Sequence, residues 1–282
     1  MNAQTSFPFA PGEPQKRMLD DLITRSLAYR TSNEFFHLAN FTRRFPYIAP
    51  FNAMLLHVQN PGIQCALCAP DWERQYKRRV NPGSRPYVIL RTMGPVAFVF
   101  DLSDTSPIDP KEDLVPASIS NPFPAKGDPP PAAVGNIEDA CLKIKILISQ
   151  RDLGTAMAGR VYSTPNQPHD FFLQLNSKHT AVQKLGTISH ELGHVFCGHL
   201  GETEDGFWLD RSDRGKVVEE FEAEAVAYFV TLRMNLDIGS DAYLAGYLQE
   251  NLRLPDYSLD AILKAAGKIE EMAQGRFRPR KK

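Results

Sequence analysis

The sequence predicts an α+β protein with two domains, a small N-terminal α+β domain and a C-terminal domain whose helices pack on a small sheet. The chain has 282 residues, of which 43% are hydrophobic, enough for one large or two modest cores. Residues 105–136 are rich in proline and show neither a helical nor a strand period, as in an extended linker. Both periods occur on each side of this segment. We therefore expect domains at 1–104 and 137–282, joined by the linker.

The N-terminal half shows helical spacing first and strand-like runs later. Apolar residues recur with a helical period over 14–40 and again over 50–59. The runs 85–92 and 96–102 are rich in β-branched and aromatic residues, and the Met-Gly-Pro sequence at 93–95 is typical of a turn. This half is therefore predicted to hold helices and a pair of strands.

The C-terminal half predicts a small sheet among longer helices. Short runs at 158–163 and 170–175 have strand character. A helix over 178–199 can begin with Asn176 or Ser177 as its N-cap. The remaining helical segments are 137–151, 215–234, 240–252 and 258–274.

Composition narrows the classes of function. The formal net charge is −1 at pH 7, so nothing global attracts nucleic acid or an anionic membrane, and either would need a local patch. The N-terminus lacks the basic start and apolar run of a signal peptide, and no segment approaches the roughly 20 apolar residues of a membrane span. We expect a cytoplasmic protein with no membrane partner.

The cysteines do not indicate a disulfide framework, because four are too few for a chain of this length. Cys65 and Cys68 form one CxxC pair, which is found in zinc ribbons and redox sites, but no second CxxC accompanies it. Ordinary buried or half-buried thiols are the favoured interpretation.

The stretch "GTISHELGHVFCGHL", residues 186–200, holds three of the seven histidines. His190 and His194 are four residues apart, so on a helix their side chains lie on one face and can hold one metal ion together. Glu191 lies beside this face, within reach of a water on the metal. This HExxH arrangement is typical of two imidazoles that bind Zn²⁺ and a glutamate that acts as general base. His199 is more typical of a packing residue.

A zinc site that keeps one position open needs a third protein ligand, and "VEEFEAEAVAYFV" at 218–230 offers four glutamates. At about 100° per residue, Glu220 and Glu224 lie about 40° apart on one helical face, while Glu219 and Glu222 project away from it. We choose Glu220 as the ligand and Glu224 as the carboxylate that orients a ligand histidine. Glutamates on a helix usually form a solvated face, but this helix is apolar nearly all round, and a buried carboxylate needs a partner.

"HELGH" followed by "EFEAEAVA" resembles the zincin domain of the ImmA/IrrE family of metallo-endopeptidases, over residues 155–235. The resemblance implies a gluzincin-type site with one zinc ion, in which the first glutamate of the ExEA motif, here Glu220, is a metal ligand. It also implies peptide-bond hydrolysis, with Glu191 moving a proton from water to the leaving amine. Position 224 departs from the family, because Glu stands where Asn is frequent, and there the chain is more similar to the antirestriction ArdC branch.

The same resemblance implies where a substrate lies. Zincins carry an edge strand that pairs with extended substrate, and the strand at 170–176 stands just before the metal helix. A donor that stabilises the developing anion is also expected. Its identity stays open among His199, Tyr228 and Arg233.

Residues 51–91 resemble the N-terminal domain of ArdC-like antirestriction proteins, which binds single-stranded DNA in that family. Ala53 and Pro82 depart from the family pattern. The resemblance is carried by Asn52, Leu55, Gln59, Pro61, Trp72, Arg79, Val80 and Gly83.

Aromatic and basic side chains also alternate within this stretch, as in proteins whose cations follow phosphates while aromatic rings stack on bases. In the alternative interpretation, Trp72 and Tyr76 belong to the core and the basic residues form a solvated rim. The candidate DNA contacts are Trp72, Tyr76, Lys77, Arg78, Arg79 and Arg85.

Two functions from different classes therefore remain. One is a zinc-dependent metallo-endopeptidase that cleaves a specific protein, with DNA-associated regulatory proteins among the candidates. The other is a single-stranded DNA-binding antirestriction protein whose zinc site is structural or regulatory. The sequence does not identify the substrate.

Overall fold

The computed structural model of the chain describes residues 29, 31–91, 96–116, 127–155, 157–165, 167–203, 208–236 and 253–279. The described residues form two compact units. Unit 1 holds residues 54–116, and unit 2 holds residues 29–53 together with those from 127 to 279. Both units contain helices and strands, so the protein belongs to the predicted α+β class.

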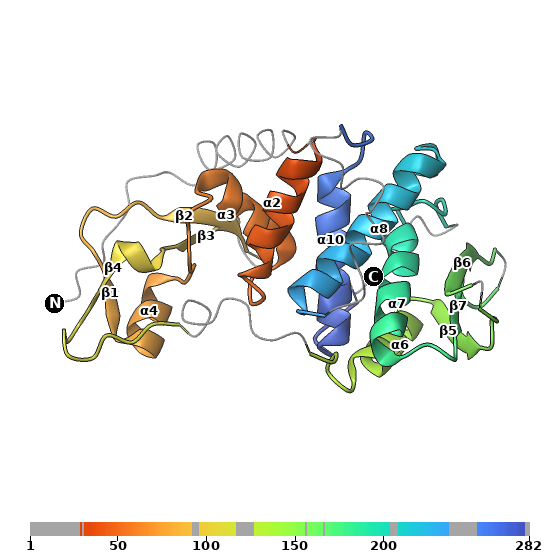
Figure 1. Cartoon of the computed structure of the whole chain (residues 1–282), viewed down its shortest axis with the longest axis horizontal. Helices are drawn as coiled ribbons and strands as arrows, with labels where there is room; N and C mark the ends of the chain where they lie inside the picture. The colour runs from red at the N-terminus through yellow and green to blue at the C-terminus, as the bar shows by residue number, and fades with distance from the viewer. Residues whose placement is uncertain are drawn as a thin grey trace. The chain divides into compact units, whose positions relative to one another are not determined.

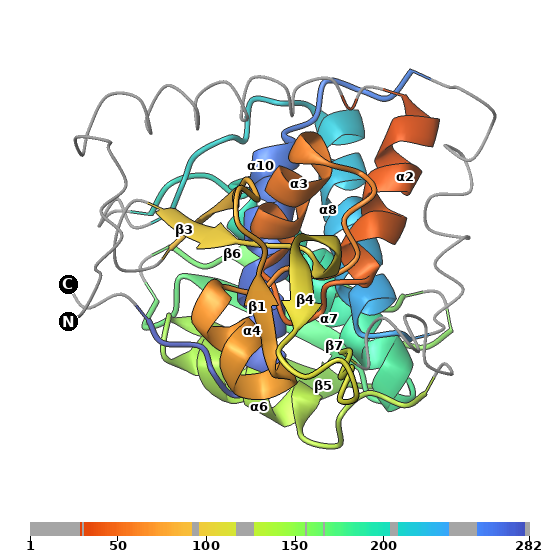
Figure 2. The same cartoon turned by 90° about the vertical axis from the view of Figure 1, so that its left-hand side faces the viewer.

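Unit 1 combines short helices with two antiparallel strand pairs. Its elements are α4 (Ala69–Tyr76), β1 (Arg78–Val80), β2 (Tyr87–Leu90), β3 (Val96–Val99), η1 (Leu102–Asp104) and β4 (Thr105–Pro107). Strand β1 pairs with β4, and α4 lies beside them (Figure 2). The pairing of β2 with β3 confirms the two strands predicted from the sequence. Helix α3 (Pro50–Gln59) has its predicted bounds.

Unit 2 is a group of helices packed on a small mixed sheet (Figure 1). Its elements are α2 (Ser32–Arg43), α6 (Ala133–Leu142), β5 (Ile146–Arg151), β6 (Gly159–Ser163), β7 (Phe171–Asn176), α7 (Ala181–Phe196), α8 (Lys216–Arg233) and α10 (Leu259–Ala273). The sheet has the order β5-β7-β6, with β7 parallel to β5 and antiparallel to β6. Helix α7 packs on β6 and β7, and α8 and α10 pack on α7. Within the described ranges, no helix has both the length and the apolar character needed to cross a membrane.

The helix predicted over 137–151 is wrong in its second half. Helix α6 ends at Leu142, and Ile146–Arg151 forms the strand β5. Lys145 has a positive φ of 60°, which ends the helical turn, and β5 then pairs with β7. This pairing buries Ile146 completely, through a contact between distant segments that local helical spacing cannot show.

Helix α7 starts later than predicted. Thr180 is its N-cap, because Asn176 still belongs to β7 and Ser177 lies in the turn after it. Thr180 and Gln183 form a capping box in which each side chain bonds the backbone N–H of the other. The predicted helix at 240–252, most of the predicted helix at 14–40 before residue 31, and linker residues 117–126 lie outside the described residues.

The two units differ from the expected domains in two segments of the chain. Residues 105–116 belong to unit 1, because β4 completes a strand pair with β1. Residues 29–53 belong to unit 2, because Phe35 of α2 packs against the rings of Phe221 and Phe229 on α8. The C-terminal unit therefore includes a helix from the beginning of the chain.

Candidate metal centre

Two histidines of α7 lie on the same face of the helix. His190 and His194 are one turn apart, and their Nε2 atoms are 3.3 Å from each other. Their side chains keep 19% and 14% of their surface exposed, so both are accessible without being fully solvated. The structure thus brings the predicted pair together.

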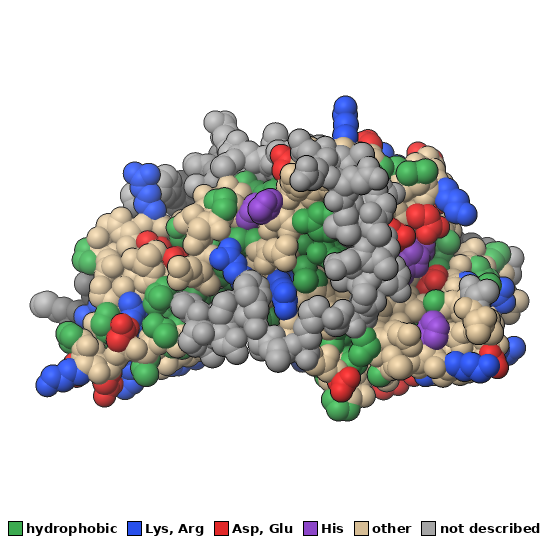
Figure 3. Space-filling view, in the orientation of Figure 1, with side chains coloured by type: hydrophobic (Ala, Val, Ile, Leu, Met, Phe, Trp, Pro, Cys, Tyr) green, Lys and Arg blue, Asp and Glu red, His purple; other side chains and the backbone are tan. Residues whose placement is uncertain are grey.

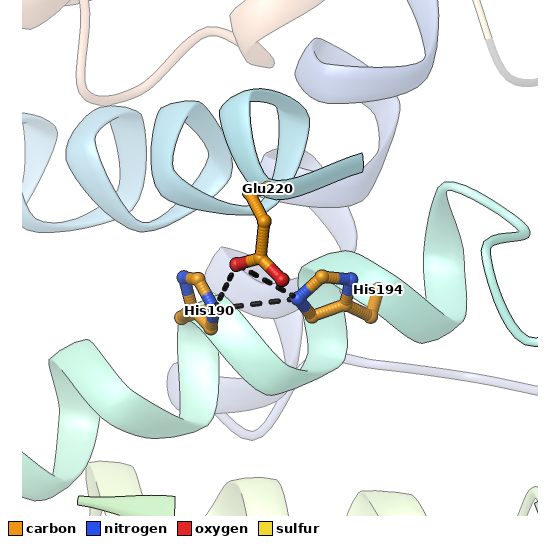
Figure 4. Close-up of side chains that lie close together, drawn as sticks. All are labelled: His190, His194 and Glu220. Carbon is orange, nitrogen blue, oxygen red and sulfur yellow. Dashed lines mark hydrogen bonds and ion pairs between the residues drawn. The ribbon is translucent and has the colours of Figure 1, made fainter. Parts of the chain in front are cut away.

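Glu220 reaches the two histidines from the neighbouring helix α8. Its Oε2 lies 3.7 Å from Nε2 of His190 and 3.8 Å from Nε2 of His194, and Figure 4 shows the three side chains pointing toward one another. The helices approach closely because Gly193 faces Ala223. A methyl group at Gly193 would lie 3.0 Å from the Cα of Ala223. Small residues on both helices therefore bring the carboxylate within reach of the imidazoles.

These three donor atoms fit a zinc ion. Two ligand atoms at about 2.0–2.1 Å from a tetrahedral zinc are about 3.3–3.4 Å apart, and the measured separations are 3.3 to 3.8 Å. Two imidazoles and one carboxylate leave the fourth position for water or substrate. The Nδ1 of His190 is buried and has no hydrogen-bond partner among the described residues. The polar interactions of that ring are therefore made through Nε2.

Burial favours the neutral form of both imidazoles. It lowers the pKa of His190 against the opposing effect of the Glu220 charge. Burial, together with His190 and His199, lowers the pKa of His194 to about 3. Only a neutral imidazole offers a lone pair to a metal, so both rings are in the form that binds zinc at neutral pH.

Glu191 is held between α7 and strand β6. Burial and the nearby Glu220 charge raise the pKa of Glu191 to about 7, against the opposing effect of the backbone N–H of Val161 on β6. Gly159 permits the close packing, because a methyl group there would lie 2.6 Å from Thr187 Cγ2 and 3.5 Å from Glu191 Oε1. Glu191 can therefore take up and release a proton near neutral pH.

A cavity of about 390 Å³ lies beside the donor atoms. Residues 159–161 of β6 form one wall, and α7, His199 and Leu200 in the turn after it, and the start of α8 form the rest. Figure 3 shows histidine and acidic side chains next to one another on the surface of unit 2. The expected edge strand at 170–176 is wrong in this respect, because β7 is the central strand of the sheet and β6 is the edge.

The structure places Glu222, rather than the expected Glu224, behind the histidines. Within the described part of the chain, Glu224 has no hydrogen bond to either one, and burial and the Glu220 charge raise its pKa to about 7. The Nδ1 of His194 instead lies 3.0 Å from Nδ1 of His199, whose Nε2 lies 2.9 Å from Glu222 Oε2. Burial acts to raise the pKa of Glu222, but hydrogen bonds from His199 and Arg211 lower it to about 2.

The three expected anion-stabilising donors are separated by the fold. His199 lines the cavity, whereas Tyr228 packs against Phe35 and Arg233 binds Glu270 in the core. Among the described residues, the cations on the cavity wall are Arg160 and Lys216, both of them exposed. Sequence reasoning missed these two, because their position depends on how β6 and the start of α8 pack around α7.

The four cysteines are free, and none belongs to the His190, His194 and Glu220 group. Cys65 is buried, and the Sγ of the half-buried Cys68 donates to Asp71 at 2.9 Å. Burial and this hydrogen bond raise the pKa of Cys68. The favoured interpretation of the CxxC pair as ordinary thiols is therefore consistent with the structure.

The six candidate DNA contacts of unit 1 divide into buried and exposed residues. Trp72 is fully buried, and its Nε1–H donates to the carbonyl oxygen of Phe100 at 2.9 Å. Arg78 is 6% exposed and bonds Thr105 and Asp113, so neither residue is free to contact DNA. Tyr76 is half-buried, and the exposed members are Lys77, Arg79 and Arg85.

Comparison with known proteins supports the C-terminal part of the resemblance. Residues 141–235 match the peptidase M78 family model, described as an IrrE N-terminal-like domain, and this confirms the resemblance stated for that region. A metal-free crystal structure of the antirestriction ArdC protein from the R388 plasmid is 17% identical, with a TM-score of 0.36. The match covers 80% of this chain and 82% of that chain. No curated protein sequence matches the chain.

Proposed function

We propose that unit 2 is a zinc-dependent metallo-endopeptidase of gluzincin type, with His190, His194 and Glu220 as the zinc ligands and Glu191 as the catalytic residue. The observation that carries the proposal is the convergence of three ligand atoms and one buried carboxyl group on a cavity walled by an edge strand. The match of residues 141–235 to an IrrE N-terminal-like domain supports the same function.

In the proposed reaction, Glu191 moves a proton. A zinc ion held by the three ligands would polarise the scissile carbonyl and lower the pKa of water at the site. Glu191 takes a proton from the attacking water and delivers it to the leaving amine.

The proposed substrate is an extended segment of a protein. The outer edge of β6, which pairs with no other described strand, offers backbone groups for pairing with such a segment, next to the donor atoms. Arg160 and Lys216 are the cations available to stabilise negative charge on the carbonyl oxygen. Because backbone pairing is indifferent to sequence, the side chains of the cavity wall select the protein that is cleaved.

Two substitutions test the proposal. Glu191→Gln removes the base and keeps the ligands, so we expect one bound zinc per chain and a loss of hydrolysis of about 10²–10⁴-fold. Glu220→Ala removes a ligand, so we expect the zinc content to fall. Metal analysis and comparison of protein fragments in cells with wild type or Glu191→Gln measure both effects, with the exposed Glu202→Gln as the control. Equal zinc content in wild type and Glu220→Ala would contradict the assignment of Glu220 as a ligand.

The second candidate is single-stranded DNA binding by unit 1, and the observation that favours it is the set of three exposed cations between 77 and 85. Charge reversal of Lys77, Arg79 or Arg85 is expected to weaken DNA binding. Each change should also reduce the slope of log K against log salt concentration by about one. Trp72→Phe should leave the affinity unchanged, because Trp72 is buried. Gel shifts over a salt series measure both quantities.

If Glu191→Gln retains the full biological effect, the antirestriction alternative with a structural zinc is favoured over proteolysis.

A further inference from the structure

A buried chain of polar side chains runs behind the candidate zinc site, from His194 through His199 to Glu222 and Arg211. The side chains of His199 and Glu222 are 1% and 0% exposed, and that of Arg211 is 12% exposed. The links are 3.0 Å between the Nδ1 atoms of His194 and His199 and 2.9 Å from His199 Nε2 to Glu222 Oε2. Arg211 donates to both oxygens of Glu222, at 2.6 and 2.7 Å. One proposed zinc ligand is therefore the first member of a continuous hydrogen-bonded chain.

The end of α7 places His199 against His194. Gly198 follows the helix with a φ of +82°, and a methyl group on it would lie 2.4 Å from the carbonyl oxygen of Leu209. The N–H of His199 donates to the carbonyl of His194 at 2.9 Å, and that of Gly198 to Val195 at 3.1 Å. These are the two bonds of a Schellman motif, which folds the chain back over the last helical turn. Glycine at position 198 is thus the local sequence signal for this contact.

The hydrogens of the chain have one consistent arrangement. Guanidinium and backbone N–H groups can only donate, and Arg211 and the N–H of Ser258 together occupy both oxygens of Glu222. Glu222 is therefore an acceptor on both sides, and the Nε2–H of His199 donates to it. In the neutral His199 ring, Nδ1 is then a bare acceptor. His194 accordingly donates its Nδ1–H and keeps the lone pair on Nε2, the atom that faces Glu220.

The same cluster is poorly suited to a second metal ion, although ligand atoms of Cys197, His199 and Glu222 lie within 4.8 Å of one another. Both ring nitrogens of His199 and both oxygens of Glu222 are already hydrogen-bonded. The Arg211 guanidinium also rests directly on Glu222 and would repel a cation. The cluster is therefore better explained by what it does to His194.

We infer that His199, Glu222 and Arg211 are positioning residues that hold His194 in the tautomer whose Nε2 binds zinc. The inference rests on the proposed zinc site. It adds that these three residues, which do not touch the metal, contribute to the zinc affinity of the site. Partners that orient a ligand histidine typically contribute about 10–100-fold to metal affinity.

Glu222→Gln in the full chain tests the inference, because it keeps the side-chain shape and turns one acceptor into a donor. Arg211 and the N–H of Ser258 can only donate hydrogen bonds. Among the partners of this side chain, the new NH₂ group can therefore donate only to Nε2 of His199. The His199 proton then moves to Nδ1, and His194 must accept there and carry its hydrogen on Nε2. We expect zinc affinity, from competition with a chelator, to fall about 10–100-fold. Nitrogen NMR of the metal-free histidine rings should show the hydrogen of His194 moving to Nε2.

Glu270→Gln is the matched control. Glu270 is another buried carboxylate bonded through both oxygens by an arginine, Arg233, at 2.6 and 3.1 Å. This control is expected to lower stability while leaving zinc affinity and the His194 tautomer unchanged. An unchanged affinity in Glu222→Gln, or an equal loss in both variants, would overturn the inference. A wild-type chain that binds no zinc would contradict the proposed function instead.

His199→Phe keeps the inference testable if Glu222→Gln does not fold. It preserves a planar ring and leaves the Arg211–Glu222 pair in place, but it removes the acceptor for the Nδ1–H of His194. We expect zinc affinity about 10–100-fold below wild type in a folded protein. Wild-type affinity in this variant would contradict the inference.

Discussion

At the scale of single residues, Cys141 shows how a buried side chain can make the stability of the fold depend on pH. Its side chain on α6 has no exposed surface, and burial together with the Glu138 charge raises its pKa from 9.0 to about 12. Between these two values the unfolded chain loses the thiol proton that the folded chain keeps. The free energy of unfolding is therefore unaffected by this group below pH 9.0 and falls above it, by about 1.4 kcal/mol per pH unit.

Urea unfolding of wild type and Cys141→Ala at about pH 8 and about pH 10 measures this dependence. The variant lacks the titrating thiol, so effects of other groups cancel in the comparison. We expect the stability advantage of the wild type to shrink by about 1.4 kcal/mol between the two conditions. An advantage that stays constant would mean that Cys141 titrates at its ordinary pKa in the folded protein.

The residues of the candidate site differ in how far the sequence could predict them. His190, Glu191 and His194 follow from spacing within one helix, and Glu220 follows from projection on the next, so local geometry was sufficient. Glu222 could not be chosen over Glu224 in this way. Its partners are Arg211, in an irregular segment between the helices, and His199, in a turn, and no period connects either with α8.

At the scale of elements, the contact between α7 and α8 depends on Gly193. A methyl group there would lie 3.0 Å from the Cα and 3.3 Å from the carbonyl oxygen of Ala223, which are backbone atoms that cannot rotate away. Gly193→Ala is therefore expected to push α8 outward. Overpacking costs about 1–3 kcal/mol and the gain in helix propensity returns about 1 kcal/mol, so stability should fall by up to about 2 kcal/mol. Zinc affinity should fall as well, because α8 carries Glu220.

Gly135→Ala provides the comparison within another helix of the same unit. Gly135 lies on α6, and a methyl group there would meet nothing within 4 Å. We expect this change to raise stability by about 0.4–1 kcal/mol and to leave zinc affinity unchanged. Thermal unfolding and chelator competition on both variants measure these effects. If the Gly193→Ala protein has the same stability and zinc affinity as the Gly135→Ala protein, the close-packing argument is wrong.

At the scale of the whole molecule, the fold depends on contacts between segments that are far apart in sequence. Arg233, at the end of α8, is 4% exposed and donates to the carbonyl oxygens of Thr42 and Ile48, at 2.6 and 2.7 Å. It also bonds both oxygens of Glu270 on α10. One buried cation therefore connects α8, α10 and the end of α2. Composition could mark a proline-rich boundary, but it could not assign α2 to unit 2, because that depends on contacts across 191 positions.

Phe35 offers a direct test of whether α2 is an integral part of unit 2. Its ring is 1% exposed and lies 5.7 Å from Phe221, 5.4 Å from Phe229 and 5.9 Å from Tyr257, measured between ring centroids. Phe35→Ala leaves a cavity, so we expect unit 2 to lose about 3–5 kcal/mol of stability. Because Phe221 follows Glu220 on α8, the amides of α8 should exchange hydrogen faster and zinc should be released at a lower temperature.

Phe98→Ala separates this effect from a general loss of aromatic packing. Phe98 lies on β3 of unit 1 and is 45% exposed, so its removal should change stability by no more than about 0.5 kcal/mol. Hydrogen exchange of the full chain measures the protection of backbone amides in both units in one experiment. In Phe35→Ala we expect faster exchange in α7 and α8 and wild-type exchange in β2 and β3. Wild-type protection of α8 in that variant would mean that unit 2 is stable without α2, and the proposed catalytic unit would then begin after residue 116.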